Sequence, residues 1–514
     1  MRLTTLFILL VPLTLLGASA SASEALLNSK CSSCHVAQDD GSLYRVSEQR
    51  KTPEGWNMTL FRMEKSHGLK ITDDERQDLI RYLSNTLGLA PQETASQRAI
   101  LERRPDYIET PADEDLNVLC ARCHTFGRIA LQRRTEVEWL KHVHFHVGQF
   151  PTIEYQALSR DRNWFDDAIN IAVPKLAELY PLKTAEWDAW QAADKPSPVG
   201  DWVVFGHWPG RGDFNALMSA SGDSESMDIT IKGQYNDGTA IDDQGQATLY
   251  TGYEWRADAN GIRQIMAMSE DGKTLTGRWF RTEDDSLGAQ VSAARIGSDA
   301  GAIALSPSAA RTGNTTSITL YGTELPETLS AEGIQFTNVS RSSDGTQLSA
   351  DALVAEGAAA GPRTLAGGVE LIVFEQIDRI AVEPAETIAR VGSNGGPIAA
   401  VPAQFDAIAW SNGSDGAADT DDDLRIGVVE ASWSSNAFDA LAEEEKDAEY
   451  AGSIDSTTGL FSPAGAGPNP ERRFGTNNVG NLSIDATVNE NGTDLTGSAH
   501  LIVTVQRFND PPIR

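Results

Sequence analysis

The sequence contains four cysteines, and all four belong to two copies of one short pattern, CxxCH. The copies are CSSCH, with Cys31, Cys34 and His35, and CARCH, with Cys120, Cys123 and His124. This pattern attaches c-type haem, because the two thiols add to the porphyrin vinyl groups and the histidine becomes an axial ligand of the iron. A four-cysteine zinc site or a thioredoxin-like redox pair needs no histidine after each second cysteine. We therefore expect two covalently bound haem c groups per chain.

The flanks of the two motifs repeat as well. LNSKCSSCH at 27–35 matches LNVLCARCH at 116–124, and RKTPEGW at 50–56 matches RRTEVEW at 133–139. Such self-similarity predicts two structural units in tandem. Between the two motifs, Thr72 and Glu75 form a capping box that begins a helix with a leucine face. The region is therefore expected to be an all-α tandem of two cytochrome c modules.

The repeat also supplies a register for the second axial ligand of each iron. Met63 lies seven residues after Trp56, and His146 lies seven residues after Trp139. Positions seven apart share one face of a helix, and thioether and imidazole are the usual partners of the proximal histidine. The predicted iron ligands are therefore His35 and Met63 in the first module and His124 and His146 in the second.

The segment LKHVHFHVGQ at 140–149 leaves other ligands open. His144 replaces His146 as the ligand if this segment is extended or if the repeat is shifted, and His142 is a further alternative. In the first module the alternative is Met58, although a position two residues after the tryptophan lies on a different helix face. All of these residues are candidates at the level of sequence.

The N-terminus predicts export. Residues 1–22 combine Arg2, an apolar run too short to span a bilayer, and small residues suited to cleavage near Ala20 or Ala22, as in a secretory signal peptide. No other segment is apolar enough to cross a membrane, so we expect an exported protein without membrane insertion. The net charge of −31 disfavours nucleic-acid partners and favours basic ones.

After residue 197 the sequence changes to short strands. Pro196 and Pro198 mark a linker, and the later segments carry Thr, Val and aromatic residues between Gly, Asp and Asn turns. We expect a multidomain chain in which an antiparallel β-barrel and two immunoglobulin-like β-sandwiches follow the helical part. The expected divisions are a signal peptide at 1–22, cytochrome c modules at 23–110 and 111–197, the barrel at 198–298, and sandwiches at 299–378 and 379–514.

The chain resembles the large (α) subunit of quinohaemoprotein amine dehydrogenase. The resemblance rests on a signal peptide, two CxxCH modules with an R-x-T-x-x-x-W repeat, a barrel-like domain beginning GDWVVFGHWPGRGDF, and two immunoglobulin-like modules in that order. It implies a periplasmic heterotrimer that oxidises primary amines to aldehyde and ammonia. In that family a small cross-linked subunit carries cysteine tryptophylquinone beside a β-propeller subunit. The α-subunit haems pass electrons to a soluble acceptor such as a small cytochrome c or a copper protein.

The cysteine count agrees with this division of labour. Because every cysteine is assigned to haem, a cysteine-derived quinone cannot form in this chain. The amine chemistry then belongs to another polypeptide, and no catalytic residue is expected here. Two alternatives are a dihaem cytochrome c subunit of another periplasmic dehydrogenase and a dihaem peroxidase, which needs an iron with an open or displaceable sixth position.

The haem content is directly measurable. We expect a pyridine haemochrome spectrum of the purified chain to give two c-type haems per polypeptide, because each CxxCH motif attaches one. A value below two contradicts the assignment of all four cysteines to haem.

Overall fold

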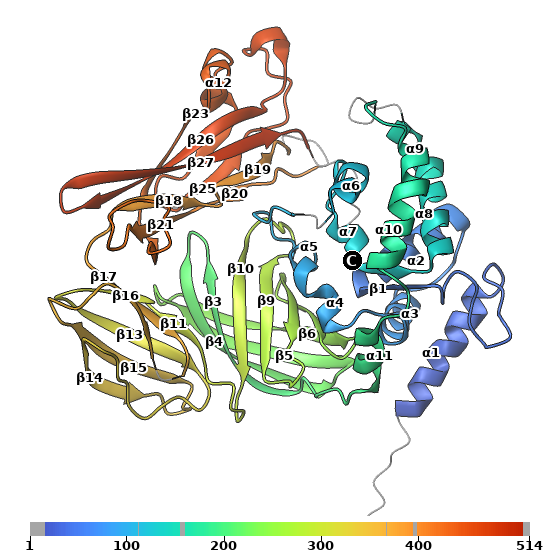
Figure 1. The fold of residues 1–514 in the computed structure, drawn as a ribbon, viewed down its shortest axis with the longest axis horizontal. Helices are drawn as coiled ribbons and strands as arrows, with labels where there is room; N and C mark the ends of the chain where they lie inside the picture. The colour runs from blue at the N-terminus through green and yellow to red at the C-terminus, as the bar shows by residue number, and fades with distance from the viewer. Residues whose placement is uncertain (1–15, 111–112, 155–159, 366, 394–397, 507–514) are drawn as a thin grey trace, which may run out of the picture.

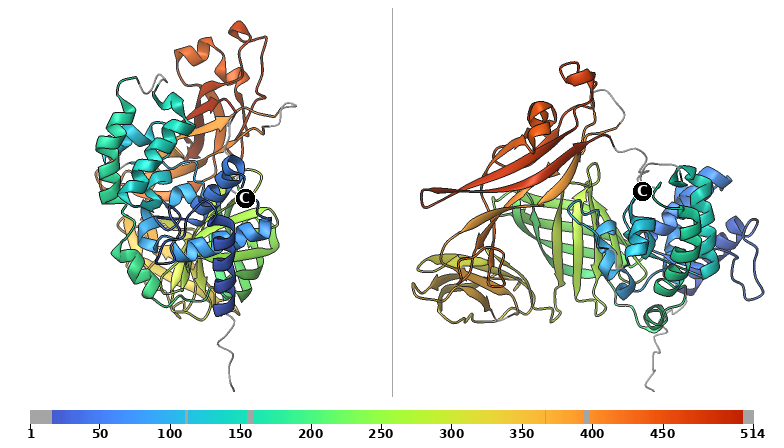
Figure 2. Two further views of the ribbon diagram at one scale, coloured as in Figure 1. Left: turned by 90° about the vertical axis from the view of Figure 1, so that its right-hand side faces the viewer. Right: turned by 45° about the horizontal axis from the view of Figure 1, so that its top comes forward.

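The computed structural model describes residues 16–110, 113–154, 160–365, 367–393 and 398–506 (Figure 1). Most of the predicted signal peptide, 1–22, lies outside the described residues. A mainly helical region comes first, a closed barrel of strands follows, and further sheets complete the chain. The helical region lies against one side of the barrel, and the sheets of residues 302–374 lie on the opposite side of the barrel (Figure 2). In the part of the chain described, no helix has the length and apolar character needed to cross a membrane.

The helical region is built from short elements. Its α-helices are α1 (Leu16–Cys31), α2 (Pro53–His67), α3 (Asp73–Thr86), α4 (Pro91–Thr94), α5 (Arg98–Leu101), α6 (Glu114–Leu116), α7 (Gly127–Ala130), α8 (Glu136–Gln149), α9 (Trp164–Asp167), α10 (Val173–Leu179) and α11 (Ala185–Ala192). Single turns of 3₁₀ or π helix are η1 (Ala95–Gln97), η2 (Asn117–Ala121), η3 (Pro151–Glu154) and η5 (Ala168–Ala172). Strands β1 (Gln49–Lys51) and β2 (Gln132–Arg134) pair in an antiparallel sheet.

The expected all-α tandem dihaem region, and with it the predicted fold class, is wrong. The chain is 25% helix and 39% strand, its helices are short, and the two halves of the helical region meet through the β1–β2 sheet. The sequences QRK and QRR contain no strong strand formers, so they give no strand signal. Their pairing is instead supported by tertiary contacts, because Arg50 and Arg133 stand opposite each other and both pair with Glu93.

The sequence repeat has the same local structure in both halves. β1 leads through Thr52 into α2, and β2 leads through Thr135 into α8. Each threonine hydroxyl accepts a backbone N–H from the first turn of its helix and so acts as the N-cap. The predicted helices after the two tryptophans are confirmed, as is the capping box of Thr72 and Glu75 at the start of α3.

The two tryptophans of the repeat hold equivalent positions. The indole N–H of Trp56 donates to the carbonyl of Leu87 at 3.0 Å, and that of Trp139 donates to the carbonyl of Tyr180 at 3.3 Å. Each of these carbonyls also accepts a backbone N–H from the adjoining strand. Both tryptophans are almost fully buried, so each fixes its helix against the core of its own half.

The two halves are related by an approximate twofold axis. Arg50 and Arg133, which are equivalent in the repeat, are direct partners in the antiparallel pairing. Further along, the guanidinium of Arg62 on α2 lies 5.4 Å from the ring centre of Phe145 on α8, and these positions are also equivalent. The axis therefore passes through the small sheet and between the two helices that carry the predicted sixth ligands.

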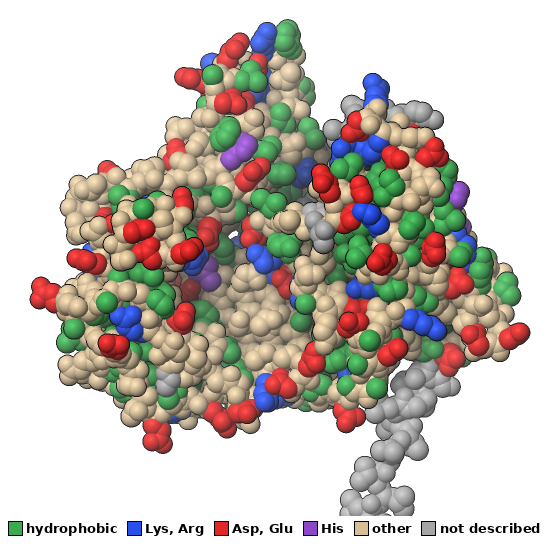
Figure 3. All heavy atoms as spheres, in the orientation of Figure 1, with side chains coloured by type: hydrophobic (Ala, Val, Ile, Leu, Met, Phe, Trp, Pro, Cys, Tyr) green, Lys and Arg blue, Asp and Glu red, His purple; other side chains and the backbone are tan. Residues whose placement is uncertain are grey.

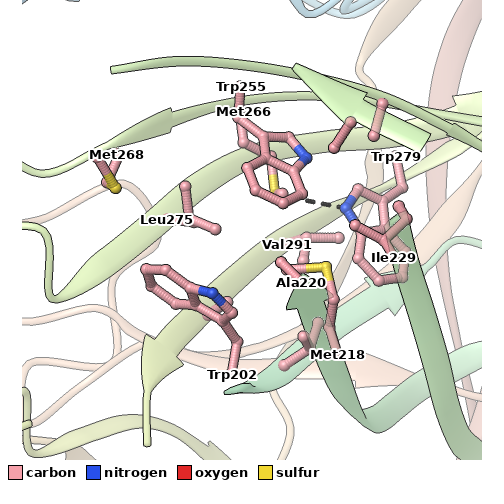
Figure 4. Packing of buried hydrophobic residues seen from close by; sticks show 14 of the residues in the cluster. Trp202, Met218, Ala220, Ile229, Trp255, Met266, Met268, Leu275, Trp279 and Val291 are labelled. Atoms are coloured by element: carbon pink, nitrogen blue, oxygen red, sulfur yellow. Dashed lines mark hydrogen bonds between the residues drawn. The ribbon is translucent and has the colours of Figure 1, made fainter. Parts of the chain in front are cut away.

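The barrel confirms the sequence-based prediction of antiparallel strands in this part of the chain. Its strands are β3 (Gly200–Trp208), β4 (Gly212–Asp223), β5 (Ser226–Tyr235), β6 (Ala240–Tyr250), β7 (Glu254–Ala259), β8 (Ile262–Met268), β9 (Thr274–Arg281) and β10 (Gly288–Arg295), and β10 closes on β3. Trp202, Trp255 and Trp279 fill the interior with Met218 and Met266 (Figure 4). Eight strands leave an interior just wide enough for side chains. The barrel is thus a packed body.

Contacts between the barrel and the helical region fix the two together. Trp190 on α11 belongs to the buried barrel cluster and donates its indole N–H to the carbonyl of Thr251 at 2.8 Å. Arg256 on β7 pairs with Glu54 on α2 at 2.6 Å. Arg278 on β9 donates to two backbone carbonyls that follow α5. The helix that carries Met63 is therefore anchored to the barrel wall near its N-terminus.

The remaining strands form several smaller sheets. Residues 302–374 contain β11 (Ala302–Ser306), β13 (Thr315–Gly322), β15 (Gln347–Val354) and β14 (Ile334–Arg341) in one sheet, and β12 (Ala309–Arg311), β17 (Glu370–Phe374) and β16 (Gly361–Thr364) in another. Residues 379–504 contain three sheets in the described structure. The first consists of β18 (Arg379–Glu383), β21 (Asp406–Ser411) and β22 (Leu424–Val429), and the second of β19 (Glu386–Arg390), β27 (Thr493–Thr504), β26 (Gly480–Glu490) and β23 (Ser432–Ala437). The third consists of β20 (Ala403–Gln404), β25 (Leu460–Pro463) and β24 (Gly452–Ile454). The third sheet, with helices α12 (Ala440–Glu444) and α13 (Asp447–Tyr450) and the turn η6 (Arg473–Gly475), departs from the expected two-sheet sandwich.

A polar network joins the barrel to both C-terminal parts. His207 on β3 contacts Asp213 on β4 at 2.7 Å and Asp406 on β21 at 3.0 Å. Asp213 also accepts a hydrogen bond from Ser306 on β11 at 2.6 Å. The network borders a cleft of about 1710 Å³ between these parts, and a hollow with charged side chains at its rim is visible in Figure 3. One histidine therefore links residues more than 190 positions apart.

The His207 network predicts a pH-dependent stability. Burial alone would lower the pKa of His207, but hydrogen bonds to Asp213 and Asp406 outweigh it and raise the pKa to about 9. Since the unfolded-state pKa is about 6.5, the stabilisation is full below that pH and is lost as the pH rises through 9. We expect His207→Gln to lower the thermal midpoint by several degrees at pH 6 and to have little effect at pH 10.

Scanning calorimetry of both proteins at the two pH values makes this comparison. The exposed His67→Gln is the matched control, and it should change neither midpoint. An equal destabilisation by His207→Gln at pH 6 and pH 10 would contradict the charged-histidine link.

Candidate haem sites

The first CxxCH motif follows directly from the end of a helix. α1 ends at Cys31, and the chain makes one further turn in which the N–H groups of Cys34 and His35 donate to the carbonyl of Cys31 at 3.1 and 2.9 Å. This turn keeps both cysteines and the histidine within one short segment. The Nδ1 atom of His35 lies 3.1 Å from the carbonyl oxygen of Tyr44. A histidine that donates from Nδ1 keeps its Nε2 lone pair available for a metal.

The second motif lies in a different kind of helix. Asp113 caps α6 by accepting the N–H of Leu116, and α6 continues as the π-helical turn η2, which contains Cys120. Burial raises the pKa of the Cys120 thiol to about 12, so this side chain is uncharged and packs with the apolar cluster of its half. Cys123 is exposed, and it borders a cavity of about 310 Å³ together with His124. The Cys123 thiol and His124 therefore adjoin open space.

The structure brings the rings of His124 and His146 close together in a tilted arrangement. Their ring centres are 6.4 Å apart with an interplanar angle of 44°. Two metal–nitrogen bonds of about 2 Å each, together with the distance from each Nε2 atom to its own ring centre, add up to a similar length. The Nδ1 atoms of both histidines contact backbone carbonyls, of Thr125 at 3.0 Å and of His142 at 3.1 Å, which leaves both Nε2 atoms for the metal. This arrangement fits a haem iron held between the two imidazoles.

The other two histidines of the segment lie in different surroundings. The segment is the helix α8, so the extended conformation on which His144 depended as a ligand is absent there. His144 is exposed, and its ring lies 5.3 Å from that of Phe165. The ring of His142 packs edge-on against His146, with the ring centres 4.8 Å apart. Burial, with repulsion from Arg134, holds the pKa of His142 well below its ordinary value, so that its ring is neutral.

Met63 in the first half is half-buried on α2 at the position equivalent to His146. Near the end of this helix, the carbonyl of Met63 accepts the N–H groups of Gly68 and Leu69. In the described part of the chain His35 and Met63 share no hydrogen bond or ring contact. The ligand pair of the first haem accordingly stays a prediction, as does the ligand role of each residue in the second.

Sequence reasoning missed the carboxylate that joins the two halves. Glu93 on α4 receives a bidentate pair of hydrogen bonds from Arg50, both at 2.9 Å, and lies 2.9 Å from Nε of Arg133. All three side chains are buried. The signal available in the sequence was the repeated arginine before each threonine and tryptophan, because two arginines in equivalent positions imply a shared role. Glu93 itself lies outside the repeat and carries no such signal.

In the described residues, no group of three or more His, Cys, Asp or Glu side chains is arranged to hold a metal ion. The three histidines of α8 therefore do not form a zinc or copper site by themselves. Two CxxCH motifs, three imidazoles with Nε2 available and open space beside one motif instead suit haem. These features place the chain in the class of haem-binding proteins.

Family comparisons agree with the site. A model described as quinohemoprotein amine dehydrogenase A, alpha subunit, haem binding, matches residues 21–187. Models of the alpha subunit domain II and domain IV of the same enzyme match residues 196–296 and 380–513. Together they cover most of the chain, and the domain II match contains the whole barrel. The chain belongs to the alpha-subunit family of quinohemoprotein amine dehydrogenase, and it is thus a subunit of an oxidoreductase.

Similarity to individual proteins is limited. No curated protein matches the chain significantly. A de novo designed fluorescence-activating beta barrel is 16% identical with a TM-score of 0.16, covering 19% of this chain and 92% of its own. A Bacteroides ovatus glucan-utilisation protein, SGBP-B, is 10% identical with a TM-score of 0.19, covering 59% of this chain and 61% of its own. These weak likenesses carry no conclusion about function.

The facing imidazoles predict different effects of two neighbouring substitutions. We expect His146→Met to change the visible spectrum and the midpoint potential of one haem, because a thioether would replace an imidazole at the iron. The matched His144→Met, on the exposed side of the same helix, should change neither. Both variants should keep two covalent haems, since neither alters a CxxCH motif. Optical redox titration of the two proteins tests this, and the reverse pattern would assign His144 as the ligand.

Proposed function

We propose that this chain is the dihaem c electron-transfer subunit of a periplasmic quinohaemoprotein amine dehydrogenase. The observation that carries the proposal is the pair of CxxCH motifs, each beside a helix that presents a candidate sixth ligand at the equivalent position. Bound haem would supply one-electron oxidation and reduction. The chain's own residues would hold the two haems through Cys31, Cys34, Cys120 and Cys123, and His35 and His124 would bind the iron.

Electron transfer is favoured over peroxide chemistry by the ligand arrangement. A peroxidase needs a sixth position that substrate can reach, whereas His124 and His146 face each other across the distance that a single iron would occupy. Met63 occupies the corresponding place in the first half. Two six-coordinate haems suit a relay between redox partners. The dihaem peroxidase is therefore the weaker alternative, and a dihaem subunit of another dehydrogenase is disfavoured by the family match.

The substrate chemistry is assigned to a partner chain. All four cysteines lie in the haem motifs, so a cysteine tryptophylquinone would belong to a small cross-linked subunit beside a β-propeller subunit. Oxidation of a primary amine to aldehyde and ammonia delivers two electrons to that quinone. The two haems of this chain would accept them singly and pass them to a small cytochrome c or a copper protein. The net charge of −31 would draw a basic acceptor by long-range attraction.

Purification of the native complex tests the proposal. We expect this chain to co-purify with a propeller subunit and a small cross-linked subunit. Anaerobic addition of a primary amine should then reduce the haems, because the quinone has no other outlet, and stopped-flow absorbance records the step. The chain purified alone is the control and should show no reduction by amine. A solitary native polypeptide, or rapid peroxide turnover by the isolated chain, would overturn the assignment.

A further inference from the structure

The two faces of the β1–β2 sheet differ in how their positive charge is balanced. Side chains alternate between the faces of a strand, so Arg50 and Arg133 point to one face, and Lys51 and Arg134 point to the other. On the first face the Glu93 carboxylate pairs with both arginines. The second face is directed toward the tryptophans of α2 and α8, where the Lys51 ammonium lies 5.1 Å from the ring centre of Trp56.

Lys51 is buried, and the charge of Glu138 in the second half acts on it only from beyond ion-pair distance. Lys51 is only 2% exposed, and its Nζ atom donates a hydrogen bond to the hydroxyl of Thr59 at 2.8 Å. Among the described residues Lys51 forms no ion pair. Position 55, where the second half has Glu138, is a glycine, and a Cβ there would come within 2.9 Å of the Cβ of Lys51. The first half therefore has no carboxylate at the position that corresponds to Glu138.

Arg134 occupies the equivalent place in the second half. Its guanidinium lies 5.4 Å from the ring centre of Trp139 and 3.9 Å from the carboxylate of Glu138, and its buried Nε has no hydrogen-bond partner in the described structure. Glu138 is already in closer contact with Arg45 at 3.2 Å and Lys141 at 2.8 Å. One carboxylate is thus shared among three cations, and Arg134 is the most distant of them.

Arg62 adds a further positive charge at the twofold axis. It lies over the ring of Phe145, and its Nε is 3.4 Å from the carbonyl oxygen of Met58, but it forms no ion pair in the part of the chain described. The charges of Lys51, Arg62 and Arg134 act on one another, so the three form a cationic cluster. Met63 and His146 directly follow Arg62 and Phe145 in sequence. Uncompensated buried charge is strongly destabilising, so a cluster of this kind requires an anion. Burial lowers the pKa of Lys51 well below its usual range and that of Arg134 to about 9, in line with a missing counter-charge.

We propose that this cationic cluster binds the carboxylate side chains of the two haem groups, with Lys51 serving the first haem and Arg134 the second. The inference rests on the proposed dihaem function. Each cation lies over the tryptophan of its own half, and that tryptophan shares a helix face with the predicted sixth ligand seven residues later. Haem carries two carboxylates at one edge, and Arg and Lys are the side chains that pair with such groups in buried sites. Arg62, at the axis, lies between the two and contributes charge to both.

Replacement of Lys51 tests the proposal by redox titration of the full chain. We expect Lys51→Met to lower the midpoint potential of one haem at pH 8, because an uncompensated carboxylate stabilises the more positive ferric state. At pH 5 the fall should shrink, since the carboxylate can then take up a proton. The matched control is Lys65→Met, which removes an exposed lysine from α2, the helix that follows β1, and should leave both potentials unchanged at either pH.

Haem content separates this inference from the proposed function. Two covalent haems by pyridine haemochrome in both variants uphold the dihaem assignment whatever the potentials do. Unaltered potentials in Lys51→Met, with thermal stability equal to or above that of the parent, would overturn the carboxylate-binding role, because removing an unpaired buried cation is neutral or stabilising. If Lys51→Met does not accumulate, the same measurements are made on Lys51→Gln, which keeps a hydrogen-bond donor, and the same criteria apply. Lys51→Arg keeps the charge and should retain the parent potentials.

Discussion

A single buried carboxylate holds the two halves of the haem-binding region together. Glu93 pairs with Arg50 and Arg133, which come from opposite strands of a small sheet and from equivalent positions of the repeat. Burial opposes ionisation of Glu93, but Arg50 and Arg133 keep its pKa below the ordinary value. Removal of the carboxylate would leave two buried guanidinium groups without a counter-charge, although both keep hydrogen bonds to backbone carbonyls. Because the same strands lead directly into α2 and α8, this contact acts together with the β1–β2 pairing and the Arg45–Glu138 ion pair to set the relative position of the helices that carry Met63 and His146.

The barrel contributes rigidity. Electron transfer requires fixed separations, and sites supported by packed elements are held more accurately than sites on loops. The barrel interior is filled by tryptophan and methionine side chains, and its wall is joined to α2 through Arg256 and Glu54. Trp190 on α11 is buried in the barrel cluster as well. The helical region has only short elements of its own, and it is therefore stabilised by packing against the barrel.

Part of this arrangement could be predicted from sequence, and part could not. The threonine caps, the helices after Trp56 and Trp139 and the antiparallel barrel depend on local patterns, and each is confirmed. The all-α expectation failed because strands made of Gln, Arg and Lys have no hydrophobic alternation and are stabilised only by contacts from elsewhere. Glu93 lies outside the repeat, so no periodicity reveals it. The domain limits and the ligand roles of the individual residues stay predictions, since they depend on boundaries and bound groups rather than on local propensity.

Gly55 occupies the position that is equivalent to Glu138 in the repeat, so the two halves carry different charge. The second half supplies its own negative charge beside its cation, whereas the first half does not. Added negative charge favours ferric iron, and histidine favours it more than methionine does. With the proposed ligands, the ligand difference would make the second haem the stronger reductant, while Glu138 offsets only part of the positive charge of Arg45, Arg134 and Lys141 around it. Two units that are equivalent in sequence would in this way differ in midpoint potential, so that electron transfer from the second half to the first is favourable.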